Sequence, residues 1–494
     1  MTDGDAAVSF HSQGRLQLGA ESTPKAPVLG EMVTVDMDDC IPTEPTTRSR
    51  PRLDLRAVWQ VSSMSLGIGI FAIPNAFLKL GWVQGAFWVV LLGFFAESAQ
   101  QRLLDAAERS GVSSYEGLAE RAFGQPGKLV MTFVTLLTTG IATLSYLGAA
   151  YSLLVGVVVA FFIDVDVNSA DGNVTVLSKA KEVIFLCLLC AAVLPRCVSR
   201  SMGAHAWIST CGVFAMCGSV ALFVYSSMHV LAAGCGAKEA CGQRAPALSG
   251  SLADALQYIA TLAFSYSMCF ALFPVLQDRV VGGDVAGGVA RMRGAVRMSV
   301  LLSTCVYLLV GIGGVFAFGT RTKTLALENL PLSQPLTQII SFVVGINTAL
   351  IVAIISFPTV QALELLVGMC RRDGTVPESV RPWLVGCLGL VCVLVDSFLP
   401  TSVAFALTGS LGLAMGAYIM PCLLFLKMDG PFGHRGSAFP RAISFLVLLF
   451  GAVLLFGSTP VTVWRTISGP SGPEHKALSD LLCPSHPNHT ALLW

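Results

Sequence analysis

The sequence predicts an all-α protein that crosses a membrane many times. This expectation rests on composition, on the number of long apolar stretches and on breaks within two of them. Of the 494 residues, 54% are hydrophobic and only 12% are charged, whereas soluble domains carry roughly 25% charged residues. The formal net charge is +1, and without a basic face the chain is not expected to bind nucleic acid. We therefore expect an integral, multi-pass membrane protein in contact with the lipid bilayer.

Eleven apolar stretches approach the roughly 20 residues that a helix needs to cross a bilayer. In chain order they cover residues 57–77, 82–103, 129–161, 181–195, 204–229, 253–276, 296–318, 335–361, 382–399, 402–426 and 439–457. The third is long enough for two helices, but Gly140 is its only internal break, so we expect a single tilted helix. The fourth is short and ends at Pro195.

The chain divides into three predicted parts. Residues 1–54 lack the apolar core of a signal peptide and carry Pro, Ser, Thr and an acidic stretch, so we expect a disordered cytoplasmic tail. Residues 55–457 form the domain of eleven transmembrane helices. Residues 458–494 form a tail on the opposite side of the membrane.

Basic residues predict the orientation, because Lys and Arg favour the cytoplasmic side of a membrane. With the N-terminus in the cytoplasm, most of the 31 basic residues lie in the N-terminal tail and the inner loops. The exceptions are Lys79, Lys179, Lys181, Lys238, Arg244, Arg321, Lys323, Arg465 and Lys476. An odd number of spans then places the C-terminus outside the cytosol.

Two sequons and two cysteines fall on the predicted outer side. Asn173 and Asn488 would be open to N-glycosylation there. Cys235 and Cys241 share the loop between the fifth and sixth stretches, where an oxidising compartment would permit a disulfide, although two free thiols fit equally well. The cysteine spacing resembles no metal site, and neither a metal nor a cofactor is predicted.

The first stretch, AVWQVSSMSLGIGIFAIPNAF at 57–77, is the most informative because it is not built like a continuous helix. Gly67 and Gly69 lie in its middle and Pro74 follows. In a helix interior Gly costs about 1 kcal/mol and Pro about 3 kcal/mol relative to Ala. Broken backbone in a membrane must be buried in protein or line a watery cavity, and transporters use it to bind substrates and ions. The alternative is a stripe of small residues for close helix packing.

The sixth stretch repeats this pattern while crossing the membrane in the opposite direction. Residues 65–74 read SLGIGIFAIP and residues 265–274 read SYSMCFALFP, with Ser and Pro at matching places. The predicted fold class is therefore an inverted repeat of five plus five transmembrane helices, broken in helices 1 and 6, with one extra C-terminal helix.

The two breaks predict where a small zwitterion would bind. Backbone donors of the first break would bind its carboxylate, because glycines permit close approach and the positive end of the following half-helix favours an anion. Hydrogen bonding between helices is the alternative for the polar side chains of the set. The substrate-binding candidates are Ser65, Gly67, Ile68, Gly69, Phe264, Ser265, Tyr266, Ser267, Tyr146 and Asn347.

Three segments carry a family resemblance: GIGIFAIPNAFLKLGWVQG at 67–85, SSYEGLAERAFGQPGK at 113–128 and YLLVGIGGVFAFGTRTKTLALENLP at 307–331. In this order and spacing they resemble the amino acid/auxin permease family of the amino acid–polyamine–organocation transporters, over residues 55–457. The resemblance implies a secondary transporter of neutral or cationic amino acids, usually coupled to H⁺ or Na⁺. Relatives often carry Gly-His where Tyr266 and Ser267 stand, so the substrate cannot be carried over.

The second of these segments also has a purely structural interpretation. Ser113 and Glu116 have the spacing of a capping box at the start of a short amphipathic helix, which Gly124 and Pro126 would end. We expect a cytoplasmic helix at the membrane face without a chemical role of its own.

The sequence is least informative about the coupling ion. Intramembrane carboxylates usually carry protons, but Glu97, Glu182 and Asp396 lie toward the ends of their stretches and fit interfacial charges better. Sodium-coupled relatives often have an Asn at the position of Ser63; a hydroxyl can still bind sodium, but this departure weakens the case for sodium. Proton coupling or uncoupled exchange is therefore favoured, and Ser63 is retained as a sodium candidate.

Other classes of function fit less well. A membrane enzyme would need clustered His, Asp or Glu, whereas the seven His residues are scattered, so we do not expect an enzyme. An amino-acid-binding membrane sensor, or a transporter of another small organic amine, would use the same cavity and is the alternative. Plasma membrane and vacuolar or other endomembrane locations both fit the sequence.

Overall fold

The computed structural model describes residues 54–162, 179–198, 206–232, 245–248, 251–266, 268–280, 283–330, 334–370, 377–396, 401–429 and 438–468. All regular secondary structure in these ranges is helical. The predictions at Asn173, Cys235, Cys241, Ser267 and Asn488 fall outside the described residues, as do residues 1–53 and 469–494.

The helices follow one another along the chain in two halves. The first half contains α1 (Leu55–Ser65), η2 (Ile68–Ala72), α2 (Ile73–Leu80), α3 (Trp82–Ser110), α4 (Tyr115–Phe162), α5 (Lys179–Val193), η3 (Leu194–Val198), α6 (Ala206–Ala232), α7 (Leu252–Ser265) and α8 (Cys269–Gln277). The second half contains α9 (Val285–Phe318), η5 (Gly319–Arg321), η6 (Ala326–Asn329), α10 (Pro335–Cys370), α11 (Val380–Asp396), α12 (Thr401–Leu407), η7 (Thr408–Ile419), α13 (Met420–Asp429), α14 (Ala438–Val453), η8 (Leu454–Ser458) and α15 (Thr459–Ser468). Of these, η7 and η8 are π-helical.

The predicted all-α membrane architecture is confirmed, including a break in the first span and another in the sixth. Among the described residues, eight helices are long and apolar enough to cross a membrane, and the bent pair Leu55–Ser65 and Ile68–Leu80 makes a ninth. The predicted fourth and ninth spans are the helices α5 and α11, of 15 and 17 residues. The count of eleven spans is therefore not confirmed.

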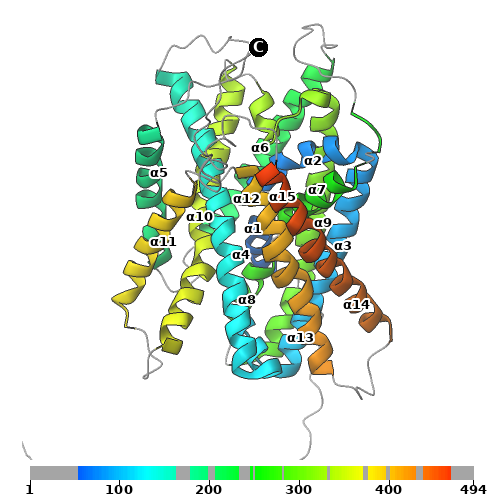
Figure 1. Ribbon diagram of the computed structural model, residues 1–494, viewed down its shortest axis with the longest axis vertical. Helices are drawn as coiled ribbons and strands as arrows, with labels where there is room; N and C mark the ends of the chain where they lie inside the picture. The colour runs from blue at the N-terminus through cyan, green and yellow to red at the C-terminus, as the bar shows by residue number, and fades with distance from the viewer. Residues whose placement is uncertain are drawn as a thin grey trace, which may run out of the picture. The chain divides into compact units, whose positions relative to one another are not determined.

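The first span lies in the interior of the helix bundle (Figure 1). Its large side chains Phe71 and Phe77 are fully buried. Helix α9 packs closely against its second half, because a Cβ on Gly311 would lie 2.8 Å from the Phe77 ring and one on Gly314 would lie 2.7 Å from Pro74. These glycines bring the two helices together and keep the broken span away from lipid.

Helix α4 consists of two helices joined at Gly124, whose φ of 71° is a conformation that glycine adopts readily. The part before Gly124 corresponds to the short helix predicted ahead of the third span. The predicted capping box is not formed there. The helix begins at Tyr115, and the Glu116 carboxylate instead accepts a hydrogen bond at 3.2 Å from the hydroxyl of Thr135, which lies on the long part of α4.

The last helical stretch is longer than its apolar segment. The predicted span ends at residue 457, but helical structure continues from α14 through the π-helical turn η8 and α15 to Ser468. Arg465 of α15 donates hydrogen bonds to Asp254 at 2.6 Å and to Gln257 at 2.9 Å, both on α7. These polar contacts join the end of the helix to the first half of the sixth span.

Candidate substrate site

At the first break, several backbone amide groups form no hydrogen bond within a helix. Helix α1 ends at Ser65, the Leu66 amide still donates to the Ser62 carbonyl at 2.7 Å, and η2 begins at Ile68 after a bend of 47°. The first amides of a helix have no partner within it. Among the described residues, no backbone acceptor is found for the amides of Gly67, Ile68 and Gly69, so three N–H donors converge on one short segment.

Several of the predicted residues meet at this break. The Tyr146 hydroxyl from α4 lies directly against Gly67, where any Cβ would collide with it. A Cβ on Gly69 would lie 3.3 Å from the Phe264 ring and 3.4 Å from the Ser265 hydroxyl, both on α7. Tyr146 and Phe264 pack edge to face with 6.0 Å between ring centroids. Backbone donors, one phenol and an aromatic wall thus share one buried place.

Tyr266 lies beside this group in sequence but points away from it. Its hydroxyl donates to the Val89 carbonyl of α3 at 2.9 Å and shares a hydrogen bond with the Thr304 hydroxyl of α9 at 2.8 Å. The side chain is 1% exposed, so it anchors the sixth break to α3 and α9. From the sequence this tyrosine was a substrate-binding candidate, and in the structure its hydroxyl makes these contacts with α3 and α9.

Asn347 and Ser63 are also directed elsewhere. A Cβ on Gly212 of α6 would lie 2.5 Å from the Asn347 Oδ1 atom, so Asn347 faces α6. The Asn347 Nδ2 atom is buried and has no hydrogen-bond partner among the described residues. The Ser63 hydroxyl donates to the Gln60 carbonyl within α1 at 2.8 Å. Both polar groups therefore face directions other than the glycines of the first break.

Sequence reasoning missed the residues that join the two breaks. The Tyr307 hydroxyl of α9 lies within hydrogen-bond distance of the backbone carbonyls of both Ser65 and Ser265, the last residues of α1 and α7. Ser303, one turn earlier, shares a hydrogen bond at 2.6 Å with the Ser65 hydroxyl. Polar residues recur every four positions in this span at Ser299, Ser303 and Tyr307, and this spacing places them on one helix face. This spacing could have indicated from the sequence that one face of the helix makes polar contacts with its neighbours.

Phe405 of α12 is a further residue that sequence reasoning missed. Its ring stacks on Phe264 with 4.9 Å between centroids. Nothing in the sequence of 402–426 separates this phenylalanine from the surrounding apolar residues, because its role depends on how α12 packs against α7.

The charged candidates lie outside this group. Glu97 accepts a hydrogen bond from Arg297 at 3.1 Å between α3 and α9. The structure does not describe the Glu182 side chain, and Asp396 is the last residue of α11. Within the described part of the chain, no group of three or more His, Cys, Asp or Glu residues could hold a metal ion.

The start of the first span, at Asp54, is joined to the end of the sixth by a hydrogen bond and an ion pair. Asp54 caps α1 by accepting from the Ala57 amide at 3.2 Å, and it pairs with Arg279 beyond α8 at 3.2 Å. Burial acts to raise the pKa of Asp54, but the Ala57 hydrogen bond and the Arg279 charge outweigh it and lower that pKa. Asp54 therefore stays charged at neutral pH, and this ion pair links the half-helices α1 and α8.

Comparison of the sequence with models of known protein families identifies a family of transporters. Residues 54–464 match the family model described as transmembrane amino acid transporter protein. Vacuolar amino acid transporter 2 of Saccharomyces cerevisiae is 22% identical over 459 residues, which cover 89% of this chain and 90% of that protein. A Rattus norvegicus protein whose name refers to sodium-coupled neutral amino acid transport is 22% identical over 390 residues, covering 76% of this chain and 77% of that protein.

Solved structures with the same fold support the arrangement of helices. MhsT in complex with L-phenylalanine has a TM-score of 0.51 at 13% identity, over 83% of this chain and 99% of that chain. A mutant of the Eremococcus coleocola manganese transporter has a TM-score of 0.52 at 13% identity, over 89% of this chain and 93% of that chain. At these identities the likeness concerns the fold alone. The match over residues 54–464 shows that the chain belongs to the transmembrane amino acid transporter protein family.

Proposed function

We propose that this transporter binds the carboxylate of an amino acid at the first break and moves it across the membrane by alternating access. The observation that carries the proposal is the group of unused amides at Gly67, Ile68 and Gly69 beside the Tyr146 hydroxyl. Backbone N–H groups at the start of a helical segment favour an anion through both hydrogen bonding and the helix dipole. The phenol adds one more donor to a carboxylate.

The aromatic wall would contact the substrate side chain. Phe264 stacks on Phe405 and packs against Tyr146, so apolar surface surrounds the carboxylate site. Such a wall supports a neutral amino acid, because an uncompensated charged side chain would lose its hydration there. The relative from Rattus norvegicus is also named for neutral amino acids. A location in the plasma membrane or in a vacuolar membrane, with a cytoplasmic N-terminus, is part of the same proposal.

Uptake of a panel of radiolabelled amino acids into proteoliposomes tests this function. Gly67→Ala adds a methyl group where the Tyr146 phenol lies, whereas Gly313→Ala on α9 adds one where no atom lies within 4 Å. Loss of one hydrogen bond to a carboxylate costs about 1.5–3 kcal/mol. The Gly67 variant should therefore lower uptake roughly 10- to 100-fold, and the Gly313 variant should transport like the wild type.

Size-exclusion profiles of both variants show whether they are folded. Equal uptake by folded Gly67→Ala protein would overturn the binding site, and the absence of uptake of every amino acid by the wild type would overturn the function.

A further inference from the structure

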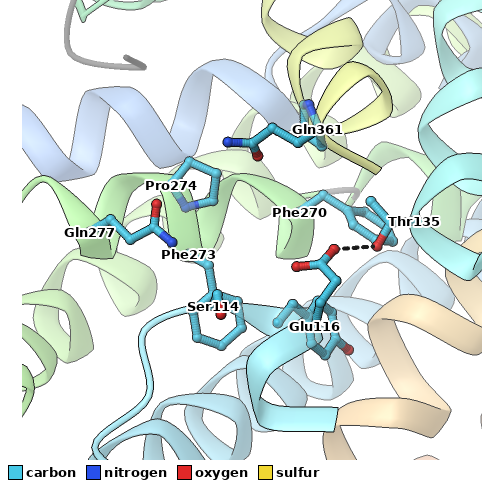
Figure 2. Close-up of a pocket in the computed structure, with 10 residues that line it drawn as sticks. Ser114, Glu116, Thr135, Phe270, Phe273, Pro274, Gln277 and Gln361 are labelled. Carbon is cyan, nitrogen blue, oxygen red and sulfur yellow. Dashed lines mark hydrogen bonds between the residues drawn. The ribbon is translucent and has the colours of Figure 1, made fainter. Parts of the chain in front are cut away.

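A small pocket at the Asp54 end of the bundle contains a carboxyl group that the substrate site does not use (Figure 2). The pocket has a volume of about 40 Å³, which is room for more than one water molecule. Glu116 and Thr135 of α4 form one wall, Phe273 and Gln277 of α8 a second, and Gln361 of α10 a third. Three helices that carry parts of the transport machinery therefore meet around one acid.

Glu116 is partly withdrawn from water, and within the described part of the chain no cation forms an ion pair with it. Its side chain is half-buried, and Figure 2 shows one oxygen directed at Thr135, which donates the 3.2 Å hydrogen bond. Of the two cations on the same helix, Lys128 is paired with Glu120 at 2.9 Å and Arg121 is exposed to solvent. Withdrawal from water favours the protonated form of a carboxyl group.

The other ionisable groups around this pocket are engaged or exposed. Tyr115, the second titratable residue among the described ones that line it, donates its hydroxyl to the Gly416 carbonyl of η7. On α10, Glu364 pairs with Arg381 at 2.6 Å. Beyond α8, Arg279 pairs with Asp54, and Asp278 is exposed to solvent. Glu116 is thus the group whose charge can change inside the pocket.

Helix α8 makes this charge relevant to transport. It is the second half of the broken sixth span, and its Gln277 side chain donates to the Ser113 carbonyl at 3.0 Å, three residues before Glu116. An ionised carboxylate only accepts hydrogen bonds and needs hydration, whereas a protonated one also donates. Ionisation therefore favours a wetter pocket with α8 farther from α4, and protonation favours the closed packing.

We propose that Glu116 is the proton-binding site of the transport cycle, reached from the cytoplasmic side, and that its protonation holds α8 closed against α4 and α10. The inference rests on the proposed transport function and names its coupling ion. In the balanced step, one proton from cytoplasmic water adds to a Glu116 carboxylate oxygen, and the same proton leaves that oxygen to water on the opposite side of the membrane later in the cycle, so one proton crosses per cycle.

A row of threonine hydroxyl groups lies along α4 between this pocket and the first break, and those of Thr139 and Thr143 donate to backbone carbonyls one turn earlier. Thr135, Thr139 and Thr143 follow one another by one turn along α4, toward Tyr146. The Thr359 hydroxyl of α10 donates to Thr139 at 2.8 Å, and Ser356 of α10 shares a 3.3 Å hydrogen bond with Thr143. From Thr135 to Tyr146 the helix rises about 16 Å. These contacts join α4 to α10 in the region between Glu116 and the substrate site, so a movement of α4 at the pocket also acts on α10 there.

Counterflow and gradient-driven uptake in proteoliposomes, measured against pH with the full-length protein, test the assignment. In the wild type we expect flux that changes with pH and accumulation driven by an imposed proton gradient. Glu116→Gln should lose both dependences. Thr135→Val removes a donor to the carboxylate, so the midpoint of the pH dependence should rise by about one to two units. Asp278→Asn, the control at the exposed carboxyl beside the pocket, should keep the wild-type profile.

Infrared difference spectra of the same proteins report the proton without any substrate. A protonated-carboxyl band that titrates in the wild type and in Asp278→Asn, and is lost in folded Glu116→Gln, supports the assignment. An unchanged band or an unchanged pH profile in Glu116→Gln overturns it. If the wild type carries no amino acid, the transport function fails, and the infrared titration still decides whether Glu116 binds the proton.

Discussion

The two broken spans differ in how each break is built. The first break is bare backbone: Gly67 and Gly69 leave amides free and let neighbours approach closely. The sixth break has an anchor of its own, because Tyr266 bonds to α3 and α9, whereas the Tyr307 hydroxyl contacts the last carbonyl before each of the two breaks. The comparison indicates that the two breaks have different roles. The first break presents hydrogen-bond donors to a ligand, and the sixth forms a side of the site that is held in place by its contacts with other helices.

Tyr146→Phe removes the phenol donor at the first break and should have the largest effect on binding. A hydrogen bond to a carboxylate is worth about 1.5–3 kcal/mol, so the KM for uptake should rise at least about tenfold, with a smaller change in maximal rate. Tyr151→Phe, on the same helix but packed against Phe185, is the matched control. A KM unchanged by Tyr146→Phe would show that the phenol does not contact substrate.

Tyr307→Phe breaks the connection between the two spans. The single proton of its hydroxyl serves two carbonyls, and leaving buried acceptors unsatisfied costs about 1–3 kcal/mol. We expect a lower midpoint of thermal unfolding in detergent and slower transport. Wild-type stability in this variant would contradict a bridging role.

Gly69→Ala tests how tightly the sixth span closes on the first. Its Cβ would lie 3.3 Å from Phe264 and 3.4 Å from the Ser265 hydroxyl, so these neighbours must shift slightly, at a cost of about 1 kcal/mol. Uptake should fall about fivefold, more for bulky substrates than for small ones. Competition assays with amino acids of increasing size measure this, and equal loss for all sizes would argue against a wall at Phe264.

Tyr266→Phe should have the smallest effect on transport. It removes hydrogen bonds to Val89 and Thr304 and should lower the free energy of unfolding by about 0.5–1.5 kcal/mol. The KM should not change, because the hydroxyl faces α3 and α9. A clear shift in substrate preference would mean that Tyr266 contacts the substrate, and the contrast between the two breaks would then fail.

The sequence determined that the chain is a membrane bundle with breaks in its first and sixth spans. Hydrophobicity over membrane length, and glycine and proline within a helix, act locally, so they can be read without knowing the neighbours. The capping box was predicted from the same kind of local pattern, but it does not form. Glu116 instead bonds to Thr135, which is 19 residues away, and a local pattern contains no information about such a partner.

Only the tertiary structure decided which way each side chain points. Tyr146 and Phe264 face the first break, whereas Tyr266 and Asn347 face other helices. The joining role of Tyr307 appears only when α1, α7 and α9 are packed together. Side chains project from all sides of a helix. Which side faces a given neighbour depends on how the helix is rotated about its axis, and close packing with helices distant in sequence fixes that rotation. The location of the breaks is therefore a property of the sequence, and the surroundings of each break are a property of the fold.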